Sequence, residues 1–69
     1  MLINGQEINI AQRRKEIQRK DGSGKTLSQS DIARYCGISI TAEQRYENDT
    51  TKNPMPEVLV KLAEILEIK

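Results

Sequence analysis

The sequence predicts an all-α fold of four helices around a small aliphatic core. Residues 27–48 are typical of a helix, a sharp turn and a second helix. Ala33 is small enough to let two helices cross closely, and Gly37 tolerates the positive φ of a turn between them. Residues 59–66 repeat apolar side chains at the i, i+3, i+4, i+7 spacing of one helical face. We therefore expect a single domain that spans residues 1–69.

Composition limits both the core and the functions open to the chain. The 69 residues contain no Trp or Phe and only two Tyr, so the core must be aliphatic and modest. Such a short chain is marginally stable, and dimerisation is one way to relieve this. The single Cys36 excludes an intrachain disulfide, and the lack of His leaves no metal-ligand cluster. We expect no metal, no cofactor, no small-molecule ligand and, without a catalytic dyad or carboxylate pair, no enzyme.

Hydropathy and charge limit the partners. No apolar run approaches the ~20 residues of a membrane span, and the polar N-terminus does not resemble a signal peptide. A cytoplasmic location is expected, in agreement with the unpaired cysteine. Eleven Lys and Arg face ten Asp and Glu, for a net charge of +1. Because six of these cations fall within residues 13–25, one end is basic, which permits nucleic-acid binding without demonstrating it.

Residues 1–8 are expected to form an N-terminal arm that contains a two-residue hairpin. The dipeptide Asn4-Gly5 accepts the positive φ values of a type I′ turn. Such a small hairpin is marginal in water and needs a partner. Either the segment is a frayed arm with Ile3 or Ile8 packed against the core, or it forms a strand that pairs with its copy in a dimer.

The first helix is expected over residues 9 to about 20, with Asn9 as its N-cap. Ile10, Arg14 and Ile17 share one face of this helix, which places an arginine between two apolar residues. Two glycines within the next four residues then end the helix.

The second helix has clear start and stop signals. Ser28 is the expected N-cap, and Asp31 lies near the positive end of the helix dipole. Ile32 and its neighbours Ala33 and Cys36 form the expected buried stripe, and Gly37 ends the helix.

The last two helices are separated by a loop over residues 49–55. Ser39 or Thr41 is expected to cap the third helix, in which Tyr46 is assigned to the core with its hydroxyl at the rim. Pro56 suits the first position of the fourth helix.

Residues along most of the chain match the spacings of a known family. They are Ile10, Arg14, Ile17, Leu27-Ser28-Gln29, Ile32-Ala33, Gly37-Ile38-Ser39, Arg45-Tyr46-Glu47-Asn48, Lys52, Pro54, Leu62-Ala63 and Leu66. From Ile10 to Ile68 the chain resembles the phage-repressor and Cro type (XRE-like) helix-turn-helix DNA-binding domain, which implies a lambda-repressor-like fold. In that family an arginine of the first helix pairs with the glutamate that ends the recognition helix, which implies a structural ion pair between Arg14 and Glu47. A desolvated pair of this kind sets geometry more than it adds stability.

The resemblance also implies which side chains meet DNA. The base-contacting positions are Ile40, Thr41, Gln44 and Arg45. The phosphate-contacting positions are Gln29, Lys52 and Asn53. Arg45 has the strongest chemistry, because its guanidinium can bind O6 and N7 of a guanine. Each of these positions also has a simpler interpretation as a solvated helix or loop residue.

Two features depart from the family pattern. Glu43 stands where the family usually places a buried Ile or Val. Burying an unpaired carboxylate costs several kcal/mol, so we expect the helix to rotate or shift, or to supply a cationic partner. The segment 21–25 also lengthens the first connection beyond the usual short turn.

The function that the sequence favours is that of a sequence-specific DNA-binding transcriptional regulator, of the phage or mobile-element repressor type. It would act as a homodimer on a palindromic operator and read double-stranded DNA through the major groove, with phosphate contacts that include the basic first helix. The alternative is a helix-turn-helix protein-interaction module, such as an antitoxin or a regulator antagonist. Glu43 and the near-neutral charge favour the alternative, whereas Arg45 and Lys52 favour DNA.

Overall fold

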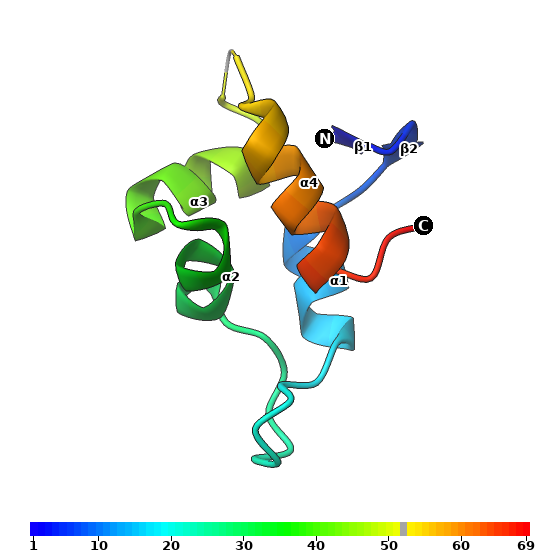
Figure 1. Cartoon of the computed structure of the whole chain (residues 1–69), viewed down its shortest axis with the longest axis vertical. Helices are drawn as coiled ribbons and strands as arrows, with labels where there is room; N and C mark the ends of the chain where they lie inside the picture. The colour runs from blue at the N-terminus through cyan, green and yellow to red at the C-terminus, as the bar shows by residue number, and fades with distance from the viewer. Residues whose placement is uncertain (52) are drawn as a thin grey trace.

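The computed structural model describes residues 1–51 and 53–69 and contains a short hairpin followed by four helices. The hairpin strands are β1 (Leu2–Ile3) and β2 (Gln6–Glu7). The helices are α1 (Ile10–Glu16), α2 (Gln29–Cys36), α3 (Ile40–Glu47) and α4 (Pro56–Ile65). Helices α2 and α3 form a corner on one side of the molecule, and α4 and α1 lie on the other (Figure 1). The expected four-helix fold and its N-terminal hairpin are confirmed.

The hairpin is held against the core by one apolar side chain. Asn4 and Gly5 adopt φ values of 52° and 76°, as the primed turn requires, and Ile3 pairs with Gln6. Ile3 is only 1% exposed, and β1 contacts α4. Burial of Ile3 supplies the packing partner that an isolated hairpin lacks. The expected contact of Ile3 with the core is therefore observed, but within a paired hairpin and not a frayed arm.

The prediction that the first helix runs to about residue 20 is wrong. The helix ends at Glu16, because Ile17 is already extended with φ −109° and ψ 125°. The Leu27 N–H donates to the Ile17 carbonyl at 2.9 Å, and the Arg19 N–H donates to the Lys25 carbonyl at 2.8 Å. These backbone bonds, together with burial of Ile17 and Leu27, replace the helical bonds that residues 17–20 would otherwise make.

Residues 17–27 thus form a narrow antiparallel loop, which we call the finger. A bridge between Gln18 and Thr26 sets its register. At its tip the Ser23 N–H donates to Asp21 Oδ1 at 3.0 Å, and Gly22 and Gly24 have positive φ. The glycines expected to stop a helix therefore close this loop instead.

The caps of α2 and α3 lie at the expected positions. Ser28 Oγ accepts the Asp31 N–H at 3.1 Å, and Asp31 Oδ2 accepts the Ser28 N–H at 2.9 Å, which completes a capping box. Gly37 ends α2 in the left-handed region, with φ 69°. Ser39, rather than Thr41, caps α3 by accepting the Ala42 N–H at 3.1 Å. These caps determine where both helices of the corner begin and end.

The core is aliphatic apart from one tyrosine. Its buried apolar members are Ile3, Ile10, Ile17, Leu27, Ile32, Ala33, Tyr46, Val58, Leu62, Ala63 and Leu66. Tyr46 packs inside, and its hydroxyl accepts the Met55 N–H at 3.1 Å, as predicted. On α4, Val58 is buried and Leu59 only half-buried, because Val58 lies four residues before Leu62 on the line that faces the core. None of the described helices is long and apolar enough to cross a membrane.

Candidate nucleic-acid interface

The outer face of α3 is formed by side chains that the core does not use. Ile40, Thr41, Gln44 and Arg45 are all exposed, at i, i+1, i+4 and i+5 of one helix. The opposite face of α3 buries Glu43 and Tyr46. Among the ion pairs formed by residues 1–51 and 53–69, none includes Arg45. Its guanidinium is therefore available to a ligand.

The start of α2 lies beside this face. Gln44 Nε2 on α3 donates to Gln29 Oε1, the first residue of α2, at 3.3 Å. The N–H groups of a helix's first turn point out of the helix and carry its positive dipole end. Gln29 therefore brings an anion-attracting helix terminus next to the outer face of α3.

A buried ion pair holds α3 against the rest of the domain. Arg14 Nη2 lies 3.5 Å from Glu47 Oε1, and the two side chains are 15% and 5% exposed. Arg14 Nη1 also donates to the Leu27 carbonyl at 3.3 Å. One guanidinium thus joins α1 to the end of α3 and to the residue that precedes the α2 cap. This arrangement explains why an arginine occupies the inner face of α1.

Comparison with known families settles what kind of domain this is. The HTH_3 helix-turn-helix family matches residues 18–69, most of the chain. The protein belongs to the HTH_3 family. HTH_3 domains are the Cro/C1-type DNA-binding domains expected from the sequence and are not enzymes. No curated protein and no solved structure matches the chain.

The match covers part of the lambda-repressor-like fold of this HTH_3 domain. It includes α2, α3, α4 and nearly all of the finger, whereas α1 and the hairpin precede it. The α2–α3 corner lies within the matched residues and coincides with the helix-turn-helix expected from the sequence, and we refer to α3 as the recognition helix. DNA is the partner that this family implies.

The recognition helix carries an unusual buried acid. Glu43 is 1% exposed, so α3 has neither rotated nor shifted to expose it. Within the described part of the chain, no hydrogen-bond donor reaches either of its carboxylate oxygens, so the expected cationic partner is also absent. Burial raises its pKa to about 8, the nearby Glu47 carboxylate adds to the increase, and Arg14 opposes it. At neutral pH Glu43 is thus mainly a neutral acid whose hydroxyl can donate to Glu47.

The remaining residues that the sequence assigns to phosphate contacts lie in the α3–α4 loop and in α1. Asn53 is exposed in the loop between α3 and α4, and Lys52 lies outside the described residues. In α1, Arg13 Nε donates to the Leu66 carbonyl at 2.9 Å, and the half-buried Arg14 is paired with Glu47. The first helix therefore offers fewer free cations than its sequence indicates. Its arginines join α1 to other helices.

Proposed function

We propose that this HTH_3 domain is a sequence-specific transcriptional regulator that reads a palindromic operator as a homodimer. The observation that carries the proposal is the exposed, unpaired Arg45 on the outer face of α3, while Glu43, the acid in the first turn of this helix, faces inward. A major groove about 12 Å wide admits one α-helix. Because Glu43 is the acidic residue in the first turn of α3 and is buried, that turn presents no carboxylate that would repel DNA phosphates.

Base reading would centre on Arg45. Its planar guanidinium can make two hydrogen bonds to one guanine, which is worth about 1–3 kcal/mol of discrimination. Thr41 offers a methyl group for a thymine and a hydroxyl for a phosphate. Ile40 is 46% exposed and can make only apolar contacts. Gln44 can contact a base, or hold Gln29 in place through the hydrogen bond between their side chains.

Phosphate contacts would fix the register of the domain on the duplex. Gln29 stands at the positive end of α2, where backbone N–H groups can bind a phosphate oxygen. Asn53 and Lys52 follow the recognition helix and would contact the backbone on the far side of the groove. Such contacts carry no sequence information, but they supply salt-dependent affinity.

A homodimer is supported by the size of the reading surface. The recognition helix spans Ile40–Glu47, about 12 Å at 1.5 Å per residue, and so covers only three or four base pairs. Two copies on half-sites about 34 Å apart would double the number of bases read. Repression would then follow from occupancy of a promoter. The assignment to a phage or mobile-element repressor is supported by the resemblance alone.

Selection of random-sequence duplexes by the purified protein tests this function. We expect enrichment of an inverted repeat with guanine at fixed positions in each half. In Arg45→Ala, specific affinity should fall about 5- to 150-fold per half-site, which corresponds to about 1–3 kcal/mol, while non-specific affinity changes little. The matched control is Lys61→Ala on α4, which removes one cation outside the corner. Equal loss for specific and random DNA would remove Arg45 from base reading. Failure to select any site would favour the protein-interaction alternative.

A further inference from the structure

The finger is placed directly against the start of the recognition motif. It ends at Leu27, and the next residue is Ser28, the N-cap of α2. Any phosphate bound at the α2 terminus near Gln29 would therefore lie close to the base of the finger. Backbone hydrogen bonds join the two arms of the finger, so the side chains of each arm have fixed positions relative to those of the other arm.

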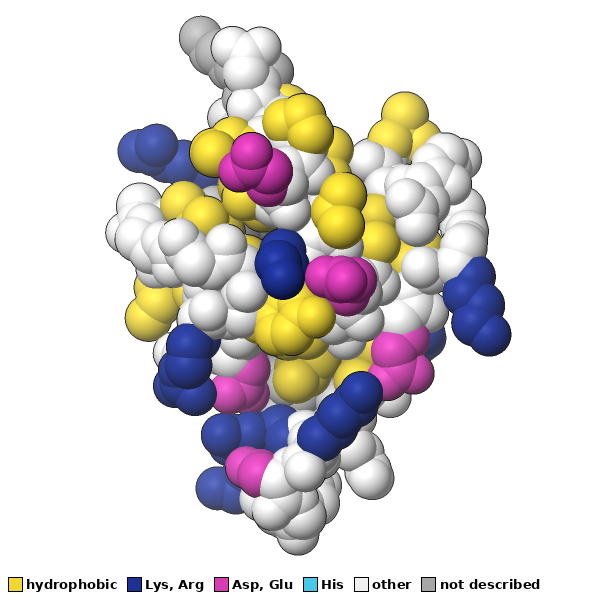
Figure 2. All heavy atoms as spheres, viewed as in Figure 1, with side chains coloured by type: hydrophobic (Ala, Val, Ile, Leu, Met, Phe, Trp, Pro, Cys, Tyr) yellow, Lys and Arg dark blue, Asp and Glu magenta, His cyan; other side chains and the backbone are white. Residues whose placement is uncertain are grey.

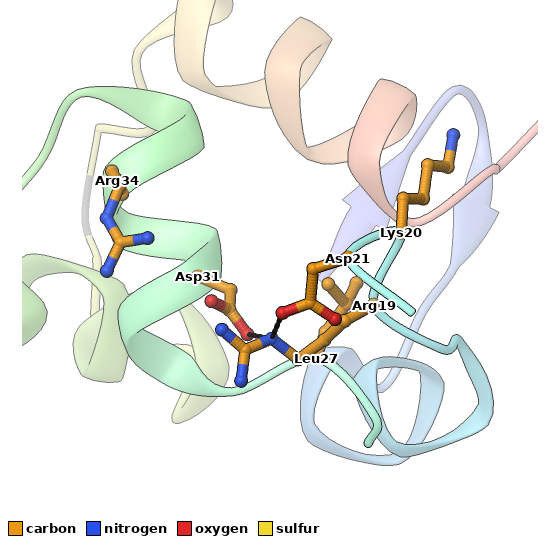
Figure 3. A pocket seen from close by; sticks show the side chains of 6 residues that line it. All are labelled: Arg19, Lys20, Asp21, Leu27, Asp31 and Arg34. Atoms are coloured by element: carbon orange, nitrogen blue, oxygen red, sulfur yellow. Dashed lines mark ion pairs between the residues drawn. The ribbon is translucent and has the colours of Figure 1, made fainter. Parts of the chain in front are cut away.

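The two faces of the finger carry different cations. In an antiparallel pair, residues directly opposite share one face, and neighbours along a strand alternate. The register Gln18–Thr26 makes Arg19 and Lys25 opposite residues, so both lie on one face and Lys20 lies on the other. Figure 3 shows Arg19 turned toward Asp31 of α2, and Lys20 turned away toward the end of α4.

Arg19 fastens the finger to α2. Its Nε lies 3.2 Å from Asp31 Oδ2 and 3.4 Å from Asp21 Oδ2 (Figure 3). The hydrogen bond from the Ser28 backbone to Asp31 lowers the pKa of that acid, so Asp31 stays ionised at neutral pH. Arg19 thus shares its charge with both nearby acids and acts as a positioning residue.

Two further cations lie on this side without such partners. Lys25 and Arg34 are exposed, and no ion pair within the described part of the chain includes either. A shallow hollow of about 290 Å³ lies between the finger and α2, and it is lined by Arg19, Lys20, Asp21, Leu27, Asp31 and Arg34. We call Lys25 and Arg34 together the finger surface. Because both nearby acids contact Arg19, the finger surface keeps a net positive charge.

The placement of the finger relative to the recognition helix fits a long ligand. The molecule measures 35 Å along its longest axis, with the finger at one end and the α3–α4 connection at the other (Figure 1). Figure 2 shows that Lys and Arg side chains gather at the finger end. One arm of the finger, residues 18–22, is about 13 Å long at 3.3 Å per residue, about the width of a DNA major groove.

We propose that the finger surface is a second phosphate-binding element, which contacts the DNA strand that meets the start of α2. This proposal rests on the proposed function, because it needs DNA on the α2–α3 corner. Lys25 and Arg34 bind consecutive phosphates outside the bases that α3 reads. They raise affinity for every sequence and do not select among them.

The test compares two double variants of the full chain on a mixed-sequence duplex of about two helical turns. Lys25→Ala with Arg34→Ala removes the finger surface. Lys61→Ala with Lys69→Ala removes the same charge from α4 and from the residue that follows Ile68, and neither side chain lines the hollow beside the finger. Fluorescence anisotropy at several KCl concentrations gives the slope of log affinity against log salt. Circular dichroism verifies that both variants stay folded, since all four side chains are exposed.

We expect the slope of the first variant to be shallower than wild type by about 1.8, that is, 0.9 for each lost phosphate contact. The ratio of wild-type to variant affinity then falls about 12-fold between about 50 and 200 mM salt. The control variant should keep the wild-type slope, and Lys25→Arg with Arg34→Lys should restore it.

Each alternative outcome refutes a separate statement. An unchanged slope in the first variant, with normal salt dependence in wild type, overturns the finger surface and leaves DNA binding intact. An equal change in both double variants also overturns it, because only net charge would then matter. Wild-type protein that binds no duplex at any salt concentration overturns the proposed function itself, and an acidic protein partner would then be the ligand to seek.

Discussion

Replacing Glu43 with Gln should remove most of the pH dependence of stability below pH 8. The pKa of the Glu43 carboxyl is 4.5 for a solvent-exposed glutamate and about 8 in the folded protein. The largest cause is burial, which disfavours the charged form. Between these values the folded chain keeps a proton that the unfolded chain has released. The free energy of unfolding therefore falls as pH rises, by about 1.4 kcal/mol per pH unit.

The magnitude follows from the two pKa values. From pH 4.5 to 7 the wild-type protein loses about 3 kcal/mol of its free energy of unfolding, and from pH 4.5 to 8 it loses about 4 kcal/mol. A buried amide at position 43 costs about 1–3 kcal/mol for its unsatisfied groups, but that cost does not depend on pH. The stability of Glu43→Gln relative to wild type should thus increase by about 4 kcal/mol between about pH 5 and pH 8.

Urea unfolding at pH 5, 6, 7 and 8 measures this difference. Glu57→Gln is the matched control, because that residue is exposed in the first turn of α4, and its profile should parallel wild type. Parallel profiles for wild type and Glu43→Gln would refute the reasoning, since Glu43 would then be ionised in the fold. A salt-dependent difference would point instead to the neighbouring Arg14–Glu47 pair.

Two further substitutions test the frame that supports the recognition helix. Gly37→Ala should lower the free energy of unfolding in urea by about 1–2 kcal/mol, because φ is 69° at this position although no atom crowds an added Cβ. Gly37→Asn should cost less, since asparagine tolerates the left-handed conformation better than alanine. Equal costs for the two variants would show that backbone conformation is not the cause. Arg14→Met should cost about 3–5 kcal/mol by leaving the Glu47 carboxylate without its ion-pair partner, whereas the exposed Lys15→Met should cost little. A loss that is the same when Arg14→Met is made in a Glu47→Gln background would count against the ion pair.

Local signals in the sequence predicted much of the fold. Ser28 and Ser39 begin helices because their hydroxyls accept backbone N–H groups three residues ahead. Gly37 ends α2, and Asn4-Gly5 makes a turn, because each tolerates positive φ. Each of these effects acts within a few residues of the chain, so the sequence reveals it without knowledge of the fold.

The finger could not be predicted in the same way. Residues 17–20 continue a plausible helical pattern, and the competing arrangement pairs them with residues 25–27. Which arrangement is stable depends on burying Ile17 and Leu27 together in the core. The lengthened connection and its basic residues were visible in the sequence, but the faces on which Lys20 and Lys25 lie were not.

By itself, the sequence determined where α2 begins and ends, because helix capping is a local property, and the resemblance to a known family indicated the residues of the outer face of α3. Only the tertiary structure decided that Glu43 stays buried, that Arg13 joins α1 to the end of α4, and that Arg19 fastens the finger to α2. The physical reason is that the charge state and the partners of an ionisable side chain depend on groups brought close by folding. Those groups lie far along the chain, where no short-range pattern identifies them.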